Sequence, residues 1–299
     1  MKTVRTPDHR FENLPDYNFS PNYMEVDDGL RLHYVDEGDP NHPTVLLLHG
    51  EPSWSYLYRK MIPILAANNF RVIAPDLIGF GKSDKPVETS DYTYQRHLDW
   101  LTTFITKLDL THILLFCQDW GGLTGLRLAT SMPDRFSMIV ASNTTLPTGT
   151  ITMPEVFMKW REFSQKSPDF DIGKVIDKGT VQELSEDVIA AYNAPFPSEA
   201  YKAGARIFPM LVPIEFDDPE SAYNREAWKK LAQWDKPFLT LFGDQDYIMK
   251  GAEKVFQKIV PGTQGQNHEY LHAGHFIQEE KGEELAQAII AFYTKNAEK

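Results

Sequence analysis

The sequence predicts an α/β fold in which helices cover both faces of a mostly parallel sheet. Runs such as 44–48 (TVLLL) and 113–116 (ILLF) are apolar throughout, as expected of strands that are buried on both faces. Segments with helical periodicity separate these runs, which is the pattern of parallel sheets. The chain has 299 residues, of which 42% are hydrophobic and 24% charged, so it is long enough to bury a sizeable core.

The first half of the chain is expected to alternate strands and helices. A hairpin is predicted over residues 23–35, because two alternating segments flank Asp28 and Gly29, a pair typical of tight turns. A helix over residues 54–67 is predicted from apolar residues spaced by three and four, at Leu57, Met61, Ile64 and Leu65. The further predicted elements are strands over 44–48, 71–74, 113–116 and 138–142, and a helix over 92–108.

Residues 148–228 interrupt this alternation. They are rich in proline, methionine, aromatic and charged residues, contain helical segments such as 182–193, and include no convincing buried strand. The sheet is expected to resume with a strand over 237–242, followed by a C-terminal helix whose apolar face includes Leu285, Ile289, Phe292 and Tyr293.

We therefore expect one core domain, residues 1–147 and 229–299, with a helical cap (148–228) inserted between two sheet strands. A cap at the carboxyl ends of the strands would cover the crevice in which such sheets bind ligands. An unrelated second domain over 148–228 is the alternative.

The composition excludes several classes of protein. Acidic residues (42) outnumber basic residues (30), and the net charge of −12 argues against nucleic acid or an anionic membrane as the main partner. The single cysteine, Cys117, allows neither an intramolecular disulfide nor a cysteine-built zinc site. Residues 1–8 show no signal-peptide pattern and no apolar run approaches the roughly 20 residues that span a bilayer, so a cytoplasmic location is expected.

The most informative segment is 116–122 (FCQDWGG), which follows a predicted buried strand and precedes a helix. This is the setting of a nucleophile elbow, where small residues such as Cys117 and Gly121 flank one exposed side chain. The central residue is Asp119, and an ionised carboxylate needs no base before it attacks a saturated carbon. The alternative for Asp119 is a helix N-cap.

An acid and a histidine should follow this nucleophile in the chain. Both Asp244 and Asp246 lie in the loop after the strand over 237–242, and Asp244 is a candidate to brace the turn. His275, with a glycine before it and a phenylalanine after it, is the preferred base, and His272 is its rival.

Two backbone N–H groups are candidates for an oxyanion hole. The segment 49–52 (HGEP) follows the first buried strand. Its position matches the loop that supplies one backbone N–H to an oxyanion hole, here expected to be the N–H of Glu51. The second N–H is expected from Trp120. The Trp120 indole N–H would also suit a weakly hydrated halide, although such a tryptophan ordinarily packs in the core. The ordinary role of Glu51 would be that of a solvated acid at the start of a helix.

These motifs resemble those of haloalkane dehalogenases. The resemblance rests on 49–60 (HGEPSWSYLYRK), 74–86 (APDLIGFGKSDKP) and 118–122 (QDWGG), and extends to 194–197 (APFP), 206–209 (RIFP) and 273–276 (AGHF). It runs from 5–8 (RTPD) nearly to the end of the chain. Epoxide hydrolases share the first two motifs, whereas the Asp-Trp pair at the elbow is more specific.

The resemblance implies an α/β-hydrolase fold and hydrolysis of small halogenated alkanes by Asp119, Asp246 and His275. It selects Asp246 because the family places its acid at the second aspartate of a Gly-x-x-Asp turn. Glu51, where another branch has asparagine, fits the branch that takes its second halide-binding tryptophan from the cap. The segment 157–160 (FMKW) matches that part of the cap, so Trp160 is expected to bind halide, and Phe157 and Pro209 to line the pocket.

Substrate and water are the only reactants implied and halide is a product, with no metal or organic cofactor, and a monomer or weak homo-oligomer is expected. Three other functions are alternatives. An epoxide hydrolase would need acidic donors, for which Tyr192 and Tyr201 are available. A serine esterase is disfavoured because the elbow has no serine. A non-catalytic binding protein on the same fold is disfavoured because Asp119, Asp246 and His275 are all present.

Overall fold

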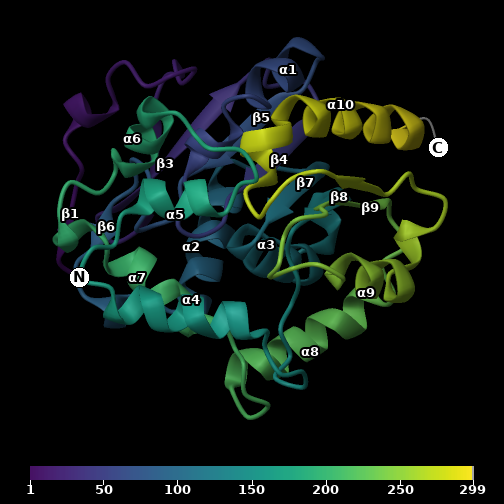
Figure 1. The fold of residues 1–299 in the computed structure, drawn as a ribbon. Helices are drawn as coiled ribbons and strands as arrows, with labels where there is room; N and C mark the ends of the chain where they lie inside the picture. Colours follow the sequence, from purple (N-terminus) through teal and green to yellow (C-terminus); the bar gives the residue numbers. More distant parts are fainter. Residues whose placement is uncertain (298–299) are drawn as a thin grey trace.

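The computed structural model describes residues 1–297 and is organised around one eight-stranded sheet (Figure 1). The strand order is β10-β9-β8-β7-β4-β5-β3-β2; β3 pairs antiparallel with β2 and β5, and the other neighbours are parallel. The strands are β2 (Asn22–Asp27), β3 (Leu30–Glu37), β4 (Thr44–Leu48), β5 (Arg71–Pro75), β7 (Ile113–Gln118), β8 (Phe136–Ser142), β9 (Phe238–Gly243) and β10 (Glu269–Leu271). The predicted mostly parallel sheet is confirmed.

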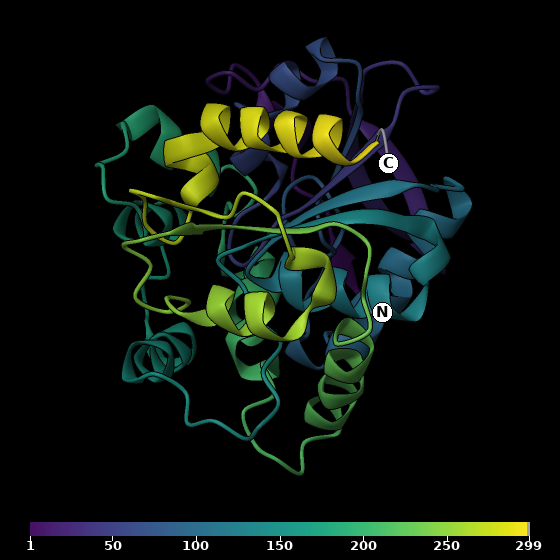
Figure 2. The ribbon, with the colours of Figure 1, turned by 90° about the vertical axis from the view of Figure 1, so that its right-hand side faces the viewer.

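Helices cover both faces of this sheet, as the alternation of elements predicted (Figure 2). Helices α1 and α10 pack together on one face, and α2, α3, α8 and α9 lie on the other. These helices are α1 (Ile62–Ala67), α2 (Tyr94–Lys107), α3 (Trp120–Ser131), α8 (Pro219–Leu231), α9 (Ala252–Ile259) and α10 (Ile277–Ala297), which is kinked at Lys281. A short strand pair, β1 (Thr3–Val4) with β6 (Lys85–Pro86), attaches the N-terminal segment. None of the helices within residues 1–297 has the length and apolarity to span a membrane.

Between β8 and β9 every regular element is helical. Four helices precede α8 in this segment: α4 (Glu155–Lys166), α5 (Ile172–Lys178), α6 (Glu186–Asn193) and α7 (Ala203–Leu211). In Figure 1 they lie on the left, to one side of the sheet. Helix α8 packs on α3, so the expected boundary between residues 228 and 229 falls inside a helix that contacts the core.

The continuous helix predicted over residues 54–67 is wrong. The chain instead forms a 3-10 turn (Ser55–Tyr58) and then the short helix α1. Pro63 is the second residue of α1, and a proline has no N–H to donate to the carbonyl four residues earlier. The apolar spacing is real, but the helix has to restart near Pro63.

The strands that lead to the site are buried along their whole length. Every residue of β4, β7 and β9 is buried, which explains their continuously apolar sequences. The carboxyl ends of these parallel strands meet at one edge of the sheet, where the loops that follow them come together.

Candidate active site

The turn between β7 and α3 holds Asp119 in a strained conformation. Its backbone angles are φ 50° and ψ −123°, a region that residues with a side chain rarely adopt. The turn is crowded, since a Cβ on Gly121 would overlap the carbonyl oxygen of Leu48, and one on Gly50 would overlap the Asp119 side chain. The glycines are therefore required by close approach, and the turn has the form of a nucleophile elbow.

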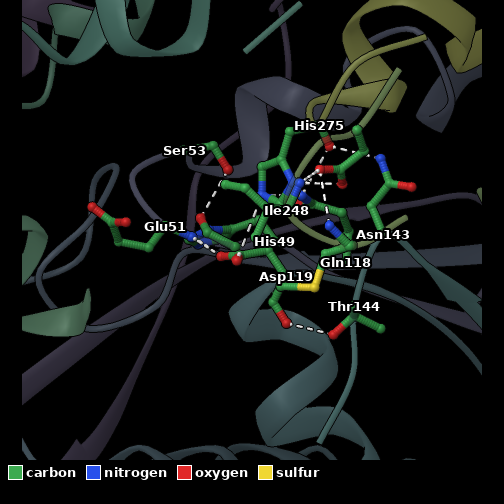
Figure 3. Close-up of polar contacts among 12 residues, drawn as sticks. His49, Glu51, Ser53, Gln118, Asp119, Asn143, Thr144, Ile248 and His275 are labelled. Atoms are coloured by element: carbon green, nitrogen blue, oxygen red, sulfur yellow. Dashed lines mark hydrogen bonds and ion pairs between the residues drawn. The ribbon is translucent and has the colours of Figure 1, made fainter. Parts of the chain in front are cut away.

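The structure brings Asp119, Asp246 and His275 together from three loops. Nδ1 of His275 lies 2.8 Å from Oδ2 of Asp246, and Nε2 lies 3.6 Å from Oδ2 of Asp119. Asp246 is buried, and its Oδ1 accepts from the backbone N–H groups of Ile248 and Met249. The imidazole thus lies between two carboxylates, of which Figure 3 labels that of Asp119.

The rival residues pair with each other instead. Nδ1 of His272 lies 3.1 Å from Oδ1 of Asp244; the His272 side chain is exposed to solvent and that of Asp244 is partly exposed. Asp244 also donates its backbone N–H to the carbonyl of Leu271, which ties the loop to the end of β10. Neither residue lines the cavity above Asp119.

The two carboxylates determine the charge of His275. Burial acts to lower the pKa of the imidazole, but Asp246 and then Asp119 outweigh it and raise the pKa to about 10. Burial acts to raise the pKa of Asp246, but the charge and hydrogen bond of His275 lower it below its ordinary value. Before any reaction at Asp119, both carboxylates therefore favour the protonated form of the imidazole.

Glu51 contributes its backbone and its side chain differently. Its backbone N–H donates to Oδ1 of Asp119 at 2.7 Å, while its side chain points away from that carboxylate (Figure 3). Burial, and then the charge of Asp119, raises the pKa of the Glu51 carboxyl well above its usual range. Both effects favour the neutral form of this buried side chain, unlike the solvated acid that its sequence position allows.

The expected second donor, the backbone N–H of Trp120, makes no hydrogen bond to the Asp119 carboxylate within residues 1–297. The Trp120 ring is buried and packs against Phe208 and Tyr94, with centroids 4.7 and 5.1 Å away. Its position next to Asp119 comes from the first turn of α3.

A cavity of about 550 Å³ lies directly above Asp119. Trp120 lines it from the core, and Phe157 and Trp160 from α4 and Pro209 from α7 line it from the other side. Trp160 also lies close enough to Glu51 to lower the pKa of its carboxyl. An apolar cavity with a few polar groups at one end suits a small apolar substrate.

The two tyrosines considered as epoxide donors do not line this cavity. The hydroxyl of Tyr192 is buried and donates to Oε2 of Glu279 at 2.6 Å. Glu279 in turn forms a bidentate ion pair with Arg59, so Tyr192 belongs to a contact between the cap and the core. The geometry does not support a role for either tyrosine in ring opening.

Two buried amide side chains next to the site were not identified from the sequence. Asn143, directly after β8, donates from Nδ2 to the carbonyls of Gly274 and His275 and accepts at Oδ1 from the N–H of Gly243. Its own carbonyl accepts from the N–H of Asp119, so it connects the three loops of the site. The second amide is Gln118. Each lies at or near the end of a predicted strand, and this position was the one feature of the sequence that could have indicated a role in the site.

No group of three or more His, Cys, Asp or Glu side chains within residues 1–297 could hold a metal ion.

Comparisons with known proteins agree with this geometry. The family model of the alpha/beta hydrolase fold matches residues 43–282. A haloalkane dehalogenase of Psychrobacter cryohalolentis is 57% identical over 301 residues, which cover 99% of this chain and 99% of the relative. A haloalkane dehalogenase of Mycobacterium marinum is 49% identical over 296 residues, covering 98% of this chain and all of the relative.

Solved structures lead to the same family. The tetrameric haloalkane dehalogenase DpaA from Paraglaciecola agarilytica NO2 superposes with a TM-score of 0.91 at 36% identity, covering 96% of this chain and 97% of that one. A putative ancestral haloalkane dehalogenase superposes with a TM-score of 0.82 at 26% identity, covering 93% of this chain and 100% of that one. The chain therefore belongs to the haloalkane dehalogenases, hydrolases of the alpha/beta hydrolase fold that convert a haloalkane and water to an alcohol and a halide ion.

Proposed function

We propose that Asp119 is the nucleophile of this dehalogenase, that His275 is its base and that Asp246 orients the base. The observation that carries the proposal is the position of the His275 ring, with Nδ1 on Asp246 and Nε2 facing Asp119 beneath an apolar cavity. Oδ1 of Asp119 is occupied by the Glu51 N–H, which leaves Oδ2 as the attacking oxygen. The rival pair, Asp244 and His272, lies away from the cavity.

In the first step, Oδ2 of Asp119 forms a bond to the carbon that carries the halogen while the carbon–halogen bond breaks. The halide leaves with the electron pair of that bond, and an alkyl ester remains on Asp119. Trp120 and Trp160 are proposed to hold the halide through their indole N–H groups, and Phe157 and Pro209 to shape the pocket. All four line the same cavity as Asp119.

In the second step, water adds to Cγ of the ester and its proton passes to Nε2 of His275. The Glu51 N–H already lies on Oδ1, where negative charge develops, and the Trp120 N–H is proposed as the second donor. The bond from Cγ to the alkyl oxygen then breaks, and His275 returns its proton to the departing alcohol. The alcohol keeps the original Oδ2, and the oxygen of water stays on Asp119. Asp119 then loses the second proton of this water to solvent and is again a carboxylate.

Bromide release from 1,2-dibromoethane and 1-bromobutane tests the nucleophile. The protein should release bromide and Asp119→Ala should not; equal release by both would overturn the assignment. His275→Phe should retain the ester as an adduct on Asp119 in intact-protein mass spectrometry. In single turnovers in ¹⁸O-water, the first alcohol should carry no label, because its oxygen comes from Asp119.

We also infer that residues 148–228 act as a cap over this cavity, since α4, α5 and α7 contribute to its lining. For the quaternary state we propose a monomer or weak homo-oligomer, which light scattering across a range of protein concentrations tests. A cytoplasmic location is proposed because the one cysteine is buried and unpaired, as is usual in reducing compartments. Cell fractionation tests this location.

A further inference from the structure

Gln118 is a buried side chain that contacts His275 twice. It is the last residue of β7 and immediately precedes Asp119. Its Nε2 donates to the backbone carbonyl of His275 at 3.1 Å and lies 3.2 Å from the ring atom Nε2 of the same residue. Nothing in the two-step reaction above uses this side chain.

The contact to the backbone fixes which way the amide faces. If the amide were reversed, Oε1 of Gln118 would face the carbonyl oxygen of His275, and two acceptors would oppose each other without a proton. With Nε2 towards His275, one N–H is bonded to the carbonyl and the other is available to the ring. The ring nitrogen that is to take the proton of water therefore faces a donor.

A donor opposite a ring nitrogen stabilises the imidazole that has a lone pair there. The other groups around His275 mostly act in the opposite sense. Asp246 and Asp119 favour the imidazolium ion, whereas burial and Asp119 favour the neutral form of the Glu51 carboxyl. The exposed Lys178 of α5 lines the same cavity. Formation of the ester removes the charge of Asp119, while the amide of Gln118 remains in place.

We propose that Gln118 is a positioning residue that donates a hydrogen bond to Nε2 of His275 and so keeps the ring neutral, with its proton on Nδ1, while the ester awaits water. A separation of 3.2 Å is longer than the usual 2.9–3.0 Å, so an incoming water can replace this bond. Gln118 thus holds the ring as a base without blocking it. The proposal rests on the roles assigned above to Asp119 and His275.

The test is the pH dependence of ester hydrolysis in single turnovers with 1,2-dibromoethane, stopped by acid and followed by intact-protein mass spectrometry. Methionine has nearly the length of glutamine but no N–H donor. In Gln118→Met the pH at which hydrolysis is half-maximal should rise by about one unit, so that the rate well below it falls about tenfold. The rate at high pH, where the ring is neutral in either protein, should stay within about threefold.

Asn143→Ala is the matched control, because Asn143 also bonds to the His275 carbonyl but makes no hydrogen bond to its ring. It should lower the rate by the same factor at every pH. Gln118→Asn, whose amide is one methylene shorter, repeats the test if the methionine variant does not fold.

Three results would overturn the role of Gln118: an unchanged half-maximal pH, an equal loss of rate at low and high pH, or the same pH shift in Asn143→Ala. Failure of the proposed function is a different result, since the unmodified protein would then form no ester on Asp119.

Discussion

Replacing Tyr192 by phenylalanine removes one hydroxyl from the contact between the cap and the core. That hydroxyl is fully buried and donates to Oε2 of Glu279 at 2.6 Å. Glu279 would keep its two hydrogen bonds from Arg59, at 2.6 and 2.7 Å, and its ion pair with Lys60 at 3.0 Å. Because the carboxylate stays paired, the larger penalty of an uncompensated buried charge does not apply.

What Tyr192→Phe loses is one hydrogen bond to a charged acceptor, worth about 1.5–3 kcal/mol. With an m-value on the order of 3 kcal/mol/M for a chain of this size, the urea midpoint should fall by about 0.5–1 M. Bromide release from 1-bromobutane should change by less than about twofold, because Tyr192 does not line the cavity.

Tyr56→Phe is the matched control. Tyr56 is buried and packs edge-to-face on Tyr192, but its hydroxyl has no hydrogen-bond partner within residues 1–297. Its removal should leave the urea midpoint unchanged or raise it slightly. The reasoning would be refuted if the two variants lost equal stability, or if Tyr192→Phe lost dehalogenase activity at an unchanged midpoint.

Three further predictions concern the site itself. Gly50→Ala should lower bromide release by about 100-fold with an unchanged far-UV circular dichroism spectrum, because the new Cβ would displace the Asp119 carboxylate; normal activity would contradict this. Since the pKa of His275 is raised to about 10 from an ordinary value of about 6.5, the folded state binds an extra proton between these values. The stability from this site is therefore complete below about pH 6.5 and is lost as the pH rises towards 10, so urea midpoints should fall more steeply over this range in the parent than in His275→Gln. Trp160→Phe keeps an aromatic ring in the cavity but removes the indole N–H, so the bromide concentration needed for product inhibition should rise about tenfold; unchanged inhibition would remove Trp160 from the halide site.

Much of the core was predictable because buried parallel strands have a simple signature. The segments 44–48, 113–116, 138–142 and 237–242 all lie in the central sheet, each within one or two residues of its predicted bounds. The edge strand β10 was not predicted, since it has three residues and is mostly exposed, so no apolar pattern marks it. The predicted continuous helix over 54–67 is wrong because Pro63 has no N–H for the helical hydrogen bond, although the apolar residues have helical spacing.

The sequence alone determined the reaction class and the strand ends at which the reacting residues lie. An aspartate at the centre of a strand–turn–helix segment, followed directly by Trp120 and later in the chain by a Gly-His motif, is local information, and the family comparisons confirm the dehalogenase that it indicates. The residue pattern favoured His275 over His272, whereas Asp246 was selected over Asp244 by the family resemblance.

Only the tertiary structure decided which side chains meet. It pairs Asp244 with His272 in solvent and Asp246 with His275 beneath the cavity, and it turns the Tyr192 hydroxyl towards Glu279. It also places Gln118 and Asn143 on the His275 loop. The physical reason is that these contacts join residues tens to more than a hundred positions apart. Their geometry depends on how several parallel strands and the loops after them are stacked, and no local pattern in the chain records that arrangement.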